Sequence, residues 1–277
     1  MQALDSIKNI PSLNEYYRKL RFGFAAGRVN LPAALVEECT DLRNFTAAEL
    51  SYEFCAALSR TAVTKLKKRF PESHCGNFFT QEQTALILNA GRNIRNDFIR
   101  TCKTMFRELA DRGIRCGSLD FSLVNILKDE NQQAIVSEIL RKLHPVLLET
   151  GETLLLPVRL PLPDPAVIAG ISRFLRDQMI SNVKLRLEIW PHSLKPDFKP
   201  EILAGTLRLE TGAMIFCCNA DTGNRLVRAH LTPWLRYFAL NGFRGPILFA
   251  PFSRGNRLAV IESEAFSKLT EEICKIH

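Results

Sequence analysis

Residues 152–192 read ETLLLPVRLPLPDPAVIAGISRFLRDQMISNVKLRLEIWPH, and this stretch decides the fold. Its two ends, 152–161 and 182–190, are rich in apolar residues, which is typical of strands that are covered on both faces. Between them, residues 164–180 have the apolar spacing of a helix, with Pro165 in the first turn. The stretch therefore predicts a strand, a crossover helix and a second, parallel strand.

The same unit repeats along most of the chain. We expect strands at 19–27, 44–51, 74–80, 114–123, 152–161, 182–190, 212–221 and 245–252. Helical periods lie at 31–42, 53–70, 93–112, 131–149, 164–180, 199–210, 230–242 and 262–276. The strands are interpreted as apolar throughout rather than alternating, and about eight such units predict a closed (β/α)8 barrel. A doubly wound sheet is the alternative, although no GxGxxG motif follows the first strand.

The length and composition agree with one large domain. A chain of 277 residues with 46% hydrophobic residues can bury a large core, but it is too short for two full-sized α/β domains and a linker. We therefore expect residues 1–277 to form a single barrel domain. Residues 1–18 are expected to be an N-terminal extension, and residues 253–277 to contain a C-terminal helix.

The charge and the cysteines narrow the class of partner. The net charge of +8 is compatible with anionic ligands or with a solvated basic surface. The one dense basic run, KLKKRF at 65–70, has no interleaved aromatic residues, so it is a poor platform for stacking nucleic-acid bases. Eight scattered cysteines without a CxxC spacing indicate core residues in a reducing cytoplasm. No segment has the pattern of a signal peptide or a membrane span.

Four short motifs appear in a familiar order. They are FTAAELS at 45–51, LRLEIWPH at 185–192, FCCNADTGN at 216–224 and LRYFALNGFRGPILF at 235–249. In this order they resemble the second, sixth, seventh and eighth strands of the xylose isomerase-like barrels. That superfamily includes sugar phosphate isomerases and epimerases and the barrel of the AP endonuclease type. The resemblance implies a xylose isomerase-like (β/α)8 fold over most of residues 19–252.

The resemblance also implies a metal site at the carboxyl ends of the strands. Barrels of this type often hold divalent cations there, on carboxylates and imidazoles. The corresponding ligands in this chain are Glu188, His192 and Asp221, and zinc, manganese or magnesium would suit such a set. The fifth and eighth strands, however, carry Arg159 and Ala250 where the family has carboxylates. We therefore expect a degenerate form of the family's site.

The functional expectation follows from these residues. We expect Glu188 and His192 to be catalytic, and a small sugar, polyol or sugar phosphate to bind at the same end of the barrel. The residues expected to bind this substrate are Asp120, Arg159, Asp221 and Arg254. One alternative is that Glu188 only forms a salt bridge with an arginine such as Arg159, and Glu49 is interpreted as a buried, paired carboxylate. Nucleic acid and membranes are not expected as partners.

Two other functions remain open at the level of the sequence. The missing carboxylates on the fifth and eighth strands favour a binding or regulatory protein that has lost catalysis on the same fold. A nuclease of the AP endonuclease type is supported only by the basic charge, and a fuller metal cluster would be expected for it.

Overall fold

The computed structural model describes residues 17–25, 45–114, 116–160, 165–190, 211–218, 223–251 and 256–275. Within these residues, eight strands form one sheet in which all the paired neighbours are parallel. The strands are β1 (Arg21–Ala25), β2 (Phe45–Leu50), β3 (Glu72–Cys75), β4 (Cys116–Ser118), β5 (Thr153–Leu160), β6 (Val183–Ile189), β7 (Thr211–Cys218) and β8 (Pro246–Pro251).

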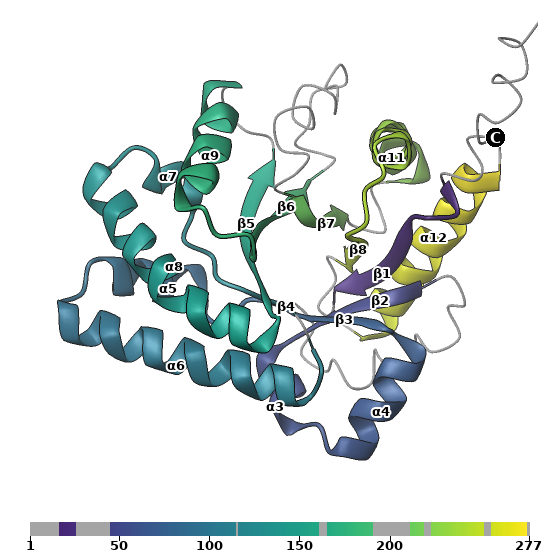
Figure 1. The fold of residues 1–277 in the computed structure, drawn as a ribbon. Coiled ribbons are helices and arrows are strands. Elements are labelled where there is room, and N and C mark those ends of the chain that lie inside the picture. The colour runs from purple at the N-terminus through teal and green to yellow at the C-terminus, as the bar shows by residue number, and fades with distance from the viewer. Residues whose placement is uncertain are drawn as a thin grey trace, which may run out of the picture.

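The sheet curls until its two end strands meet. The strand order is β3-β2-β1-β8-β7-β6-β5-β4, and a single parallel bridge between Asn77 and Ser118 joins the segments after β3 and within β4. Two backbone hydrogen bonds support this seam: Phe78 N donates to Ser118 O at 3.0 Å, and Ser118 N donates to Gly76 O at 3.2 Å. The result is the nearly closed barrel visible in Figure 1, which confirms the predicted (β/α)8 class rather than an open doubly wound sheet.

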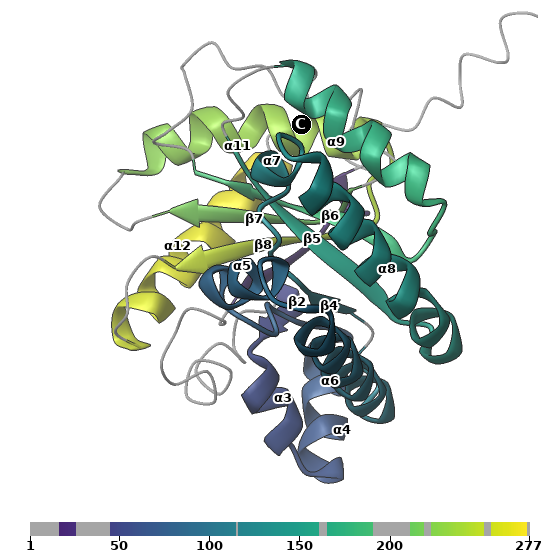
Figure 2. The same cartoon turned by 90° about the vertical axis from the view of Figure 1, so that its left-hand side faces the viewer.

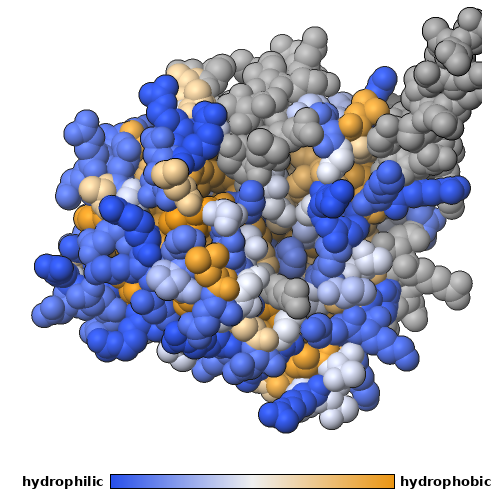
Figure 3. Space-filling view, viewed as in Figure 1, coloured by the Kyte–Doolittle hydropathy of each residue, from blue (hydrophilic) through white to orange (hydrophobic). Residues whose placement is uncertain are grey.

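The described helices surround the sheet (Figure 2). They are α3 (Tyr52–Ala57), α4 (Arg60–Arg69), α5 (Gln81–Leu88), α6 (Arg92–Asp111), α7 (Leu123–Ile126), α8 (Glu130–Thr150), α9 (Pro165–Gln178), α11 (Gly223–Leu240) and α12 (Asn256–Lys275). On the side of the molecule that Figure 3 shows, the surface of the described residues is mostly hydrophilic. None of the described helices combines the length and the apolar character that crossing a membrane requires.

Glycines follow two of the predicted helices. Gly113 follows α6 with a φ of 65°, and Gly151 follows α8 with a φ of 69°. A residue with a β-carbon rarely adopts this left-handed conformation, so glycine is the usual residue just beyond a helix. α8 also begins as expected for its sequence, because the Asp129 side chain accepts hydrogen bonds from the backbone of the first turn.

Several predicted boundaries are wrong. The single helix expected at 53–70 is two helices, because Ser59 begins a second helix by accepting a hydrogen bond from Ala62 N at 3.2 Å. The strand expected at 114–123 is only Cys116–Ser118, followed by the short helix α7. Among the other differences, α5 was not predicted, and β3 is Glu72–Cys75 rather than 74–80. The helices α11 and α12 begin before residues 230 and 262, where the sequence places their starts. The helices expected at 31–42 and 199–210 lie outside the described residues.

Pro157 lies inside β5, where a proline normally removes a hydrogen bond from the ladder. The carbonyl of Leu155 accepts a hydrogen bond from Leu119 N. The backbone polar groups of every second β5 residue, Leu155 and Pro157 among them, therefore point toward the β4 side. The β4 ladder ends at the pair Ser118 and Leu155, and Pro157 lies beyond it. The missing N–H therefore points to a side on which β5 no longer has a paired strand.

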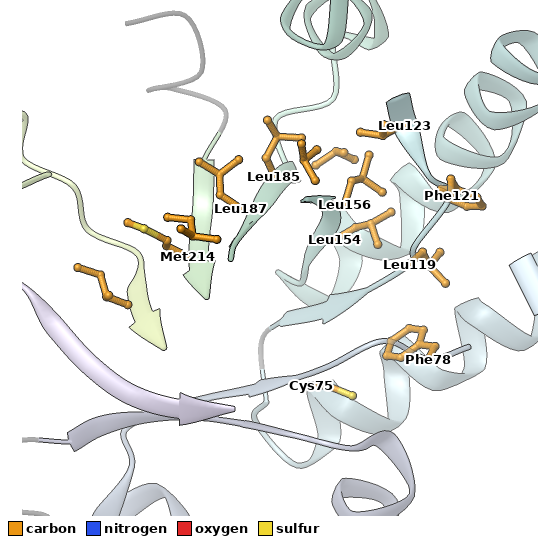
Figure 4. Packing of buried hydrophobic residues seen from close by; sticks show 14 of the residues in the cluster. Cys75, Phe78, Leu119, Phe121, Leu123, Leu154, Leu156, Leu185, Leu187 and Met214 are labelled. Atoms are coloured by element: carbon orange, nitrogen blue, oxygen red, sulfur yellow. The ribbon is translucent and has the colours of Figure 1, made fainter. Parts of the chain in front are cut away.

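The main hydrophobic core lies between the sheet and the helices. Figure 4 shows Leu154, Leu156, Leu185 and Leu187 on the face of β5 and β6 that the helices cover. A second, smaller cluster occupies part of the barrel interior and consists of Ala25, Ala47, Ile215, Cys217, Leu248 and Ala250. The cysteines whose side chains are described are all buried, as expected for core residues: Cys55, Cys75, Cys102, Cys116 and Cys217.

The expectation that every strand is apolar throughout is wrong for β6. In VKLRLEI, charged residues occupy alternate positions, and Arg186 and Glu188 are both buried. Alternate residues of a strand point to opposite faces, so the leucines face the helices while the charged residues face the barrel interior. The interior tolerates these charges because they pair with one another, as described below.

Candidate functional site

Three of the predicted site residues meet at the carboxyl ends of neighbouring strands. Asp120 follows β4, Arg159 is the second-last residue of β5, and Glu188 is the second-last residue of β6. Arg159 and Glu188 are direct neighbours in the β5–β6 register, so they lie at the same level. In (β/α)8 barrels this end carries the active site, because the loops that follow the strands converge there.

Arg159 connects the other members of this group. Its Nε lies 3.3 Å from Oε2 of Glu188, and its Nη2 lies 2.8 Å from Oδ2 of Asp120. The third nitrogen of its guanidinium, Nη1, donates to Oε1 of Gln81 at 2.6 Å. The Arg159 side chain is 48% exposed, whereas those of Glu188 and Asp120 are 2% and 4% exposed. Arg159 is therefore the member of the group that solvent, or a ligand, can reach.

A second arginine lies deeper in the barrel. Arg186 is buried, and its Nη2 donates to Oε1 of Glu188 at 2.7 Å while its Nη1 donates to Oε2 of Glu49 at 3.0 Å. It also donates to Ser118 Oγ at 3.0 Å and to Asn77 Oδ1 at 3.1 Å. Paired in this way, a buried guanidinium avoids most of the cost of leaving water.

The two arginines and three carboxylates form one continuous chain of ion pairs, which we call the mouth cluster. Its members, in order of contact, are Glu49, Arg186, Glu188, Arg159 and Asp120. With the carboxylates ionised and the arginines protonated, the formal charge of the cluster is −1. The chain spans β2, β6, β5 and the residues after β4, so it joins both halves of the barrel.

Burial changes the proton affinities in the mouth cluster. Loss of solvent raises the pKa of the Asp120 carboxyl above its ordinary value, although the Ser122 N–H and the Arg159 guanidinium act in the opposite direction. Burial disfavours the charged form of Arg186, but the adjacent carboxylates of Glu49 and Glu188 raise its pKa above its ordinary value. Arg186 is therefore a permanent positive charge, and Asp120 binds a proton more readily than an exposed aspartate does.

The structure brings together only part of the predicted site. Asp120, Arg159 and Glu188 lie in contact, and the predicted pairing of Glu49 is confirmed by its bond to Arg186. The other three predicted residues, His192, Asp221 and Arg254, lie outside the described residues. Sequence reasoning missed Arg186 and Gln81. The alternation of charge in KLRLE at 184–188 was the available signal for Arg186, while Gln81 carried none.

The carboxylates in the described part of the site do not fit a divalent cation. Both oxygens of Glu188 accept hydrogen bonds from arginines, and Oδ2 of Asp120 accepts from Arg159. Within the described part of the chain there is no group of three histidine, cysteine, aspartate or glutamate residues that could hold a metal ion. The metal set Glu188, His192 and Asp221 stays a prediction, and no chemical step is derived through a metal.

A cavity of about 720 Å³ lies at the opposite end of the barrel. It is lined by the first residues of the strands, among them Arg21, Glu72, Thr153, Lys184 and Pro246. Barrel enzymes place their chemistry at the carboxyl ends of the strands, while the other end mainly contributes to stability. We therefore assign the candidate site to the mouth cluster and not to this cavity.

The architecture is that of a nearly closed (β/α)8 barrel, with the mouth cluster at the carboxyl ends of its strands. Among solved structures, an L-ribulose 3-epimerase superposes with a TM-score of 0.69 at 15% identity, covering 92% of this chain and 96% of that chain. The D-psicose 3-epimerase of Clostridium cellulolyticum H10 gives a TM-score of 0.63 at 13% identity, covering 93% and 98%. A xylose isomerase domain protein from Planctomyces limnophilus gives 0.62 at 13% identity, covering 92% and 98%.

At these identities the likeness concerns the fold. No protein-family model matches the sequence, and no curated protein matches it either. The chemistry must therefore be argued from the mouth cluster itself, because one barrel fold serves many unrelated reactions.

Proposed function

We propose that the protein binds a small sugar, polyol or sugar phosphate at the mouth cluster and acts as a sugar isomerase or epimerase. The observation that carries the proposal is the cluster of Arg159, Glu188 and Asp120 at the carboxyl end of a barrel. Several solved barrels with the same fold are sugar 3-epimerases, which supports a sugar as the ligand. Charged side chains that lie side by side suit a ligand covered with hydroxyl groups.

Three members of the mouth cluster take part in the proposed reaction. When isomerisation or epimerisation next to a carbonyl proceeds by proton transfer, a base removes a proton from carbon, negative charge builds on the carbonyl oxygen, and a proton is then returned to carbon. Arg159, the exposed member, donates to that oxygen. Asp120, with its raised pKa, or Glu188 takes the proton once Arg159 turns toward the ligand. In the full proposal, His192 carries a proton. Asp221 and Arg254 contact the substrate.

A binding protein without catalysis is the second candidate, and one observation favours it. The carboxylates of Glu188 and Asp120 are almost fully buried beneath Arg159, and both are bonded to its guanidinium. Both oxygens of Glu188 already accept hydrogen bonds from arginines, so this carboxylate is a poor proton acceptor for an arriving ligand. Such a site recognises a sugar without moving its protons.

Solvent isotope exchange separates the two candidates. The protein is incubated in D2O with D-psicose, D-tagatose, D-fructose or L-ribulose, and the proton signals of each sugar are followed by NMR. An isomerase or epimerase exchanges the hydrogen next to the carbonyl for deuterium, even when the equilibrium hides net conversion. Binding without exchange supports the second candidate. The absence of both binding and exchange for every sugar contradicts the proposal.

Substitutions then test the assigned positions. Asp120→Asn and Glu188→Gln keep the shape of the side chains but remove the carboxylates, and each should abolish exchange. Arg107→Gln is a matched control, because Arg107 forms an exposed ion pair with Glu149 on the outer helices. It should exchange as the unmodified protein does. Equal losses in the control would show that the effect is not specific to the mouth cluster.

A further inference from the structure

The carboxyl ends of three adjacent strands present an acidic, a basic and an acidic residue in turn. Asp120 follows β4, Arg159 is on β5, and Glu188 is on β6. The guanidinium of Arg159 donates to both carboxylates, through Nη2 at 2.8 Å and through Nε at 3.3 Å. It therefore occupies the position between the two acids at which a shared cation would have to bind.

The charges of the mouth cluster also disfavour a divalent cation at this position. Three carboxylates pair with two guanidinium groups, so the cluster carries one net negative charge. A divalent cation at Glu188 would meet Arg159 on one oxygen and Arg186 on the other. Both arginines would then lie within a few ångströms of the ion, where like charges repel strongly in a water-poor site.

We propose that Arg159 is a built-in replacement for a metal ion, so that this site takes its positive charge from the chain and needs no divalent cation. A guanidinium is always charged and has five N–H donors, so it can hold two carboxylates and still offer a donor outward. The exposed half of the Arg159 side chain provides that outward face. The inference concerns the same site as the proposed function, but it holds whether or not the ligand is a sugar.

The proposal predicts that one substitution creates a metal site. The substitution Arg159→Glu changes the formal charge of the mouth cluster from −1 to −3 and places three carboxylates on three adjacent strand ends. Oxygen-rich clusters of this kind suit manganese or magnesium. The variant should therefore gain a divalent cation site at the position that the guanidinium now occupies.

Mn²⁺ binding measures this directly, because free Mn²⁺ gives a strong electron paramagnetic resonance signal that is lost on binding. The unmodified full-length protein should bind no Mn²⁺ tightly, whereas Arg159→Glu should bind roughly one ion per chain and at least about tenfold more tightly. Adding Glu188→Gln to Arg159→Glu should remove the gained site. The proposal is overturned if the unmodified protein binds one tight Mn²⁺ that Glu188→Gln abolishes.

Two control variants make the result specific. Arg107→Glu makes the same charge change beside the carboxylate of Glu149, but on the outer surface, and it should gain no tight site. If it binds Mn²⁺ as well as Arg159→Glu does, the gain is only an effect of added charge and the proposal fails. Arg159→Gln serves if Arg159→Glu does not fold. Removing one positive charge should raise Mn²⁺ affinity above that of the unmodified protein, and an unchanged affinity counts against the proposal.

Because no sugar is present, this experiment is independent of the proposed function. A protein that exchanges no sugar protons but gains a metal site in Arg159→Glu keeps the inference and loses the function. A protein that exchanges sugar protons only with bound Mn²⁺ keeps the function and loses the inference.

Discussion

Arg186 on β6 donates a hydrogen bond across the barrel interior to Glu49 on β2, with 3.0 Å between Nη1 and Oε2, although 137 positions separate the two residues. The interiors of (β/α)8 barrels are usually filled by layers of branched apolar side chains. Here an ion pair takes that place and joins strands from opposite halves of the chain. The contact links the stability of the barrel to the electrostatics of its mouth.

Removing Arg186 should destabilise the protein strongly. Arg186→Met keeps most of the side-chain volume but leaves Glu49 and Glu188 without this buried cation. Breaking a buried ion pair on one side typically lowers the free energy of unfolding by ~3–5 kcal/mol. Urea denaturation of the variant measures the loss. Adding Glu49→Gln to Arg186→Met should recover part of it, and strictly additive losses would show that the two residues are not coupled.

Acid should destabilise the protein through His74. Burial, together with the positive charges of Arg21 and Arg186, lowers the pKa of His74 to about 4 from the model-compound value of 6.5. The unfolded chain therefore takes up a proton at a higher pH than the folded protein. This contribution to stability is fully present above pH 6.5 and is lost as the pH falls toward 4.

A variant isolates this contribution. Relative to His74→Gln, the unmodified protein should lose roughly 2–3 kcal/mol of unfolding free energy between about pH 7 and about pH 4. Denaturation curves of both proteins at a series of pH values give the difference. Parallel pH profiles for the two proteins would show that His74 titrates normally.

Gly23 on β1 should tolerate no β-carbon. An added β-carbon would lie 2.0 Å from the carbonyl oxygen of Ala47 on β2, so alanine forces the two strands apart. Overpacking of this kind costs ~1–3 kcal/mol or more. The matched control is Gly170→Ala on α9, where the nearest neighbour is a leucine methyl at 3.3 Å and alanine favours the helix by up to ~1 kcal/mol. Thermal unfolding should shift down for the first variant and not for the second.

Arg159→Gln should raise the pKa of Asp120 further. The Arg159 guanidinium is one of the groups that lower this pKa, while burial raises it. Removing the positive charge leaves burial and the charge of Glu188 to act with less opposition. NMR titration of the Asp120 carboxyl carbon measures the change. A pKa that stays constant would mean that Arg159 and Asp120 do not form this ion pair in solution.

The fold could be predicted because local signals and global architecture agree in this chain. The unit at 152–192 contains two runs of branched residues around a helix with a strong period, and all three elements lie within two residues of their predicted bounds. Boundaries failed where a small polar residue decides them. Ser59 reads as an ordinary helical residue within 53–70, yet its hydroxyl caps a new helix.

The site was predicted only in part, for a related reason. Strand ends mark Arg159 and Glu188, because their positions follow from the strands themselves. The role of Arg186 depends on Glu49, far away in the sequence, and only the closed barrel brings the two together. The alternating charges at Lys184, Arg186 and Glu188 indicate a polar interior face, but they specify no partners.

We propose that a sugar binds at the mouth cluster and not in the cavity at the other end of the barrel. Two-dimensional NMR of ¹⁵N-labelled protein tests this most directly during titration with D-psicose or L-ribulose. Binding of a sugar at the mouth cluster should cause saturable shifts of the Arg159 Nε–H signal and of the Gln81 side-chain amide signal. The Arg159 signal is assigned with Arg159→Lys. Shifts confined to Arg244 and Gly245 beside the opposite cavity, or no shifts with any sugar, would contradict this proposal.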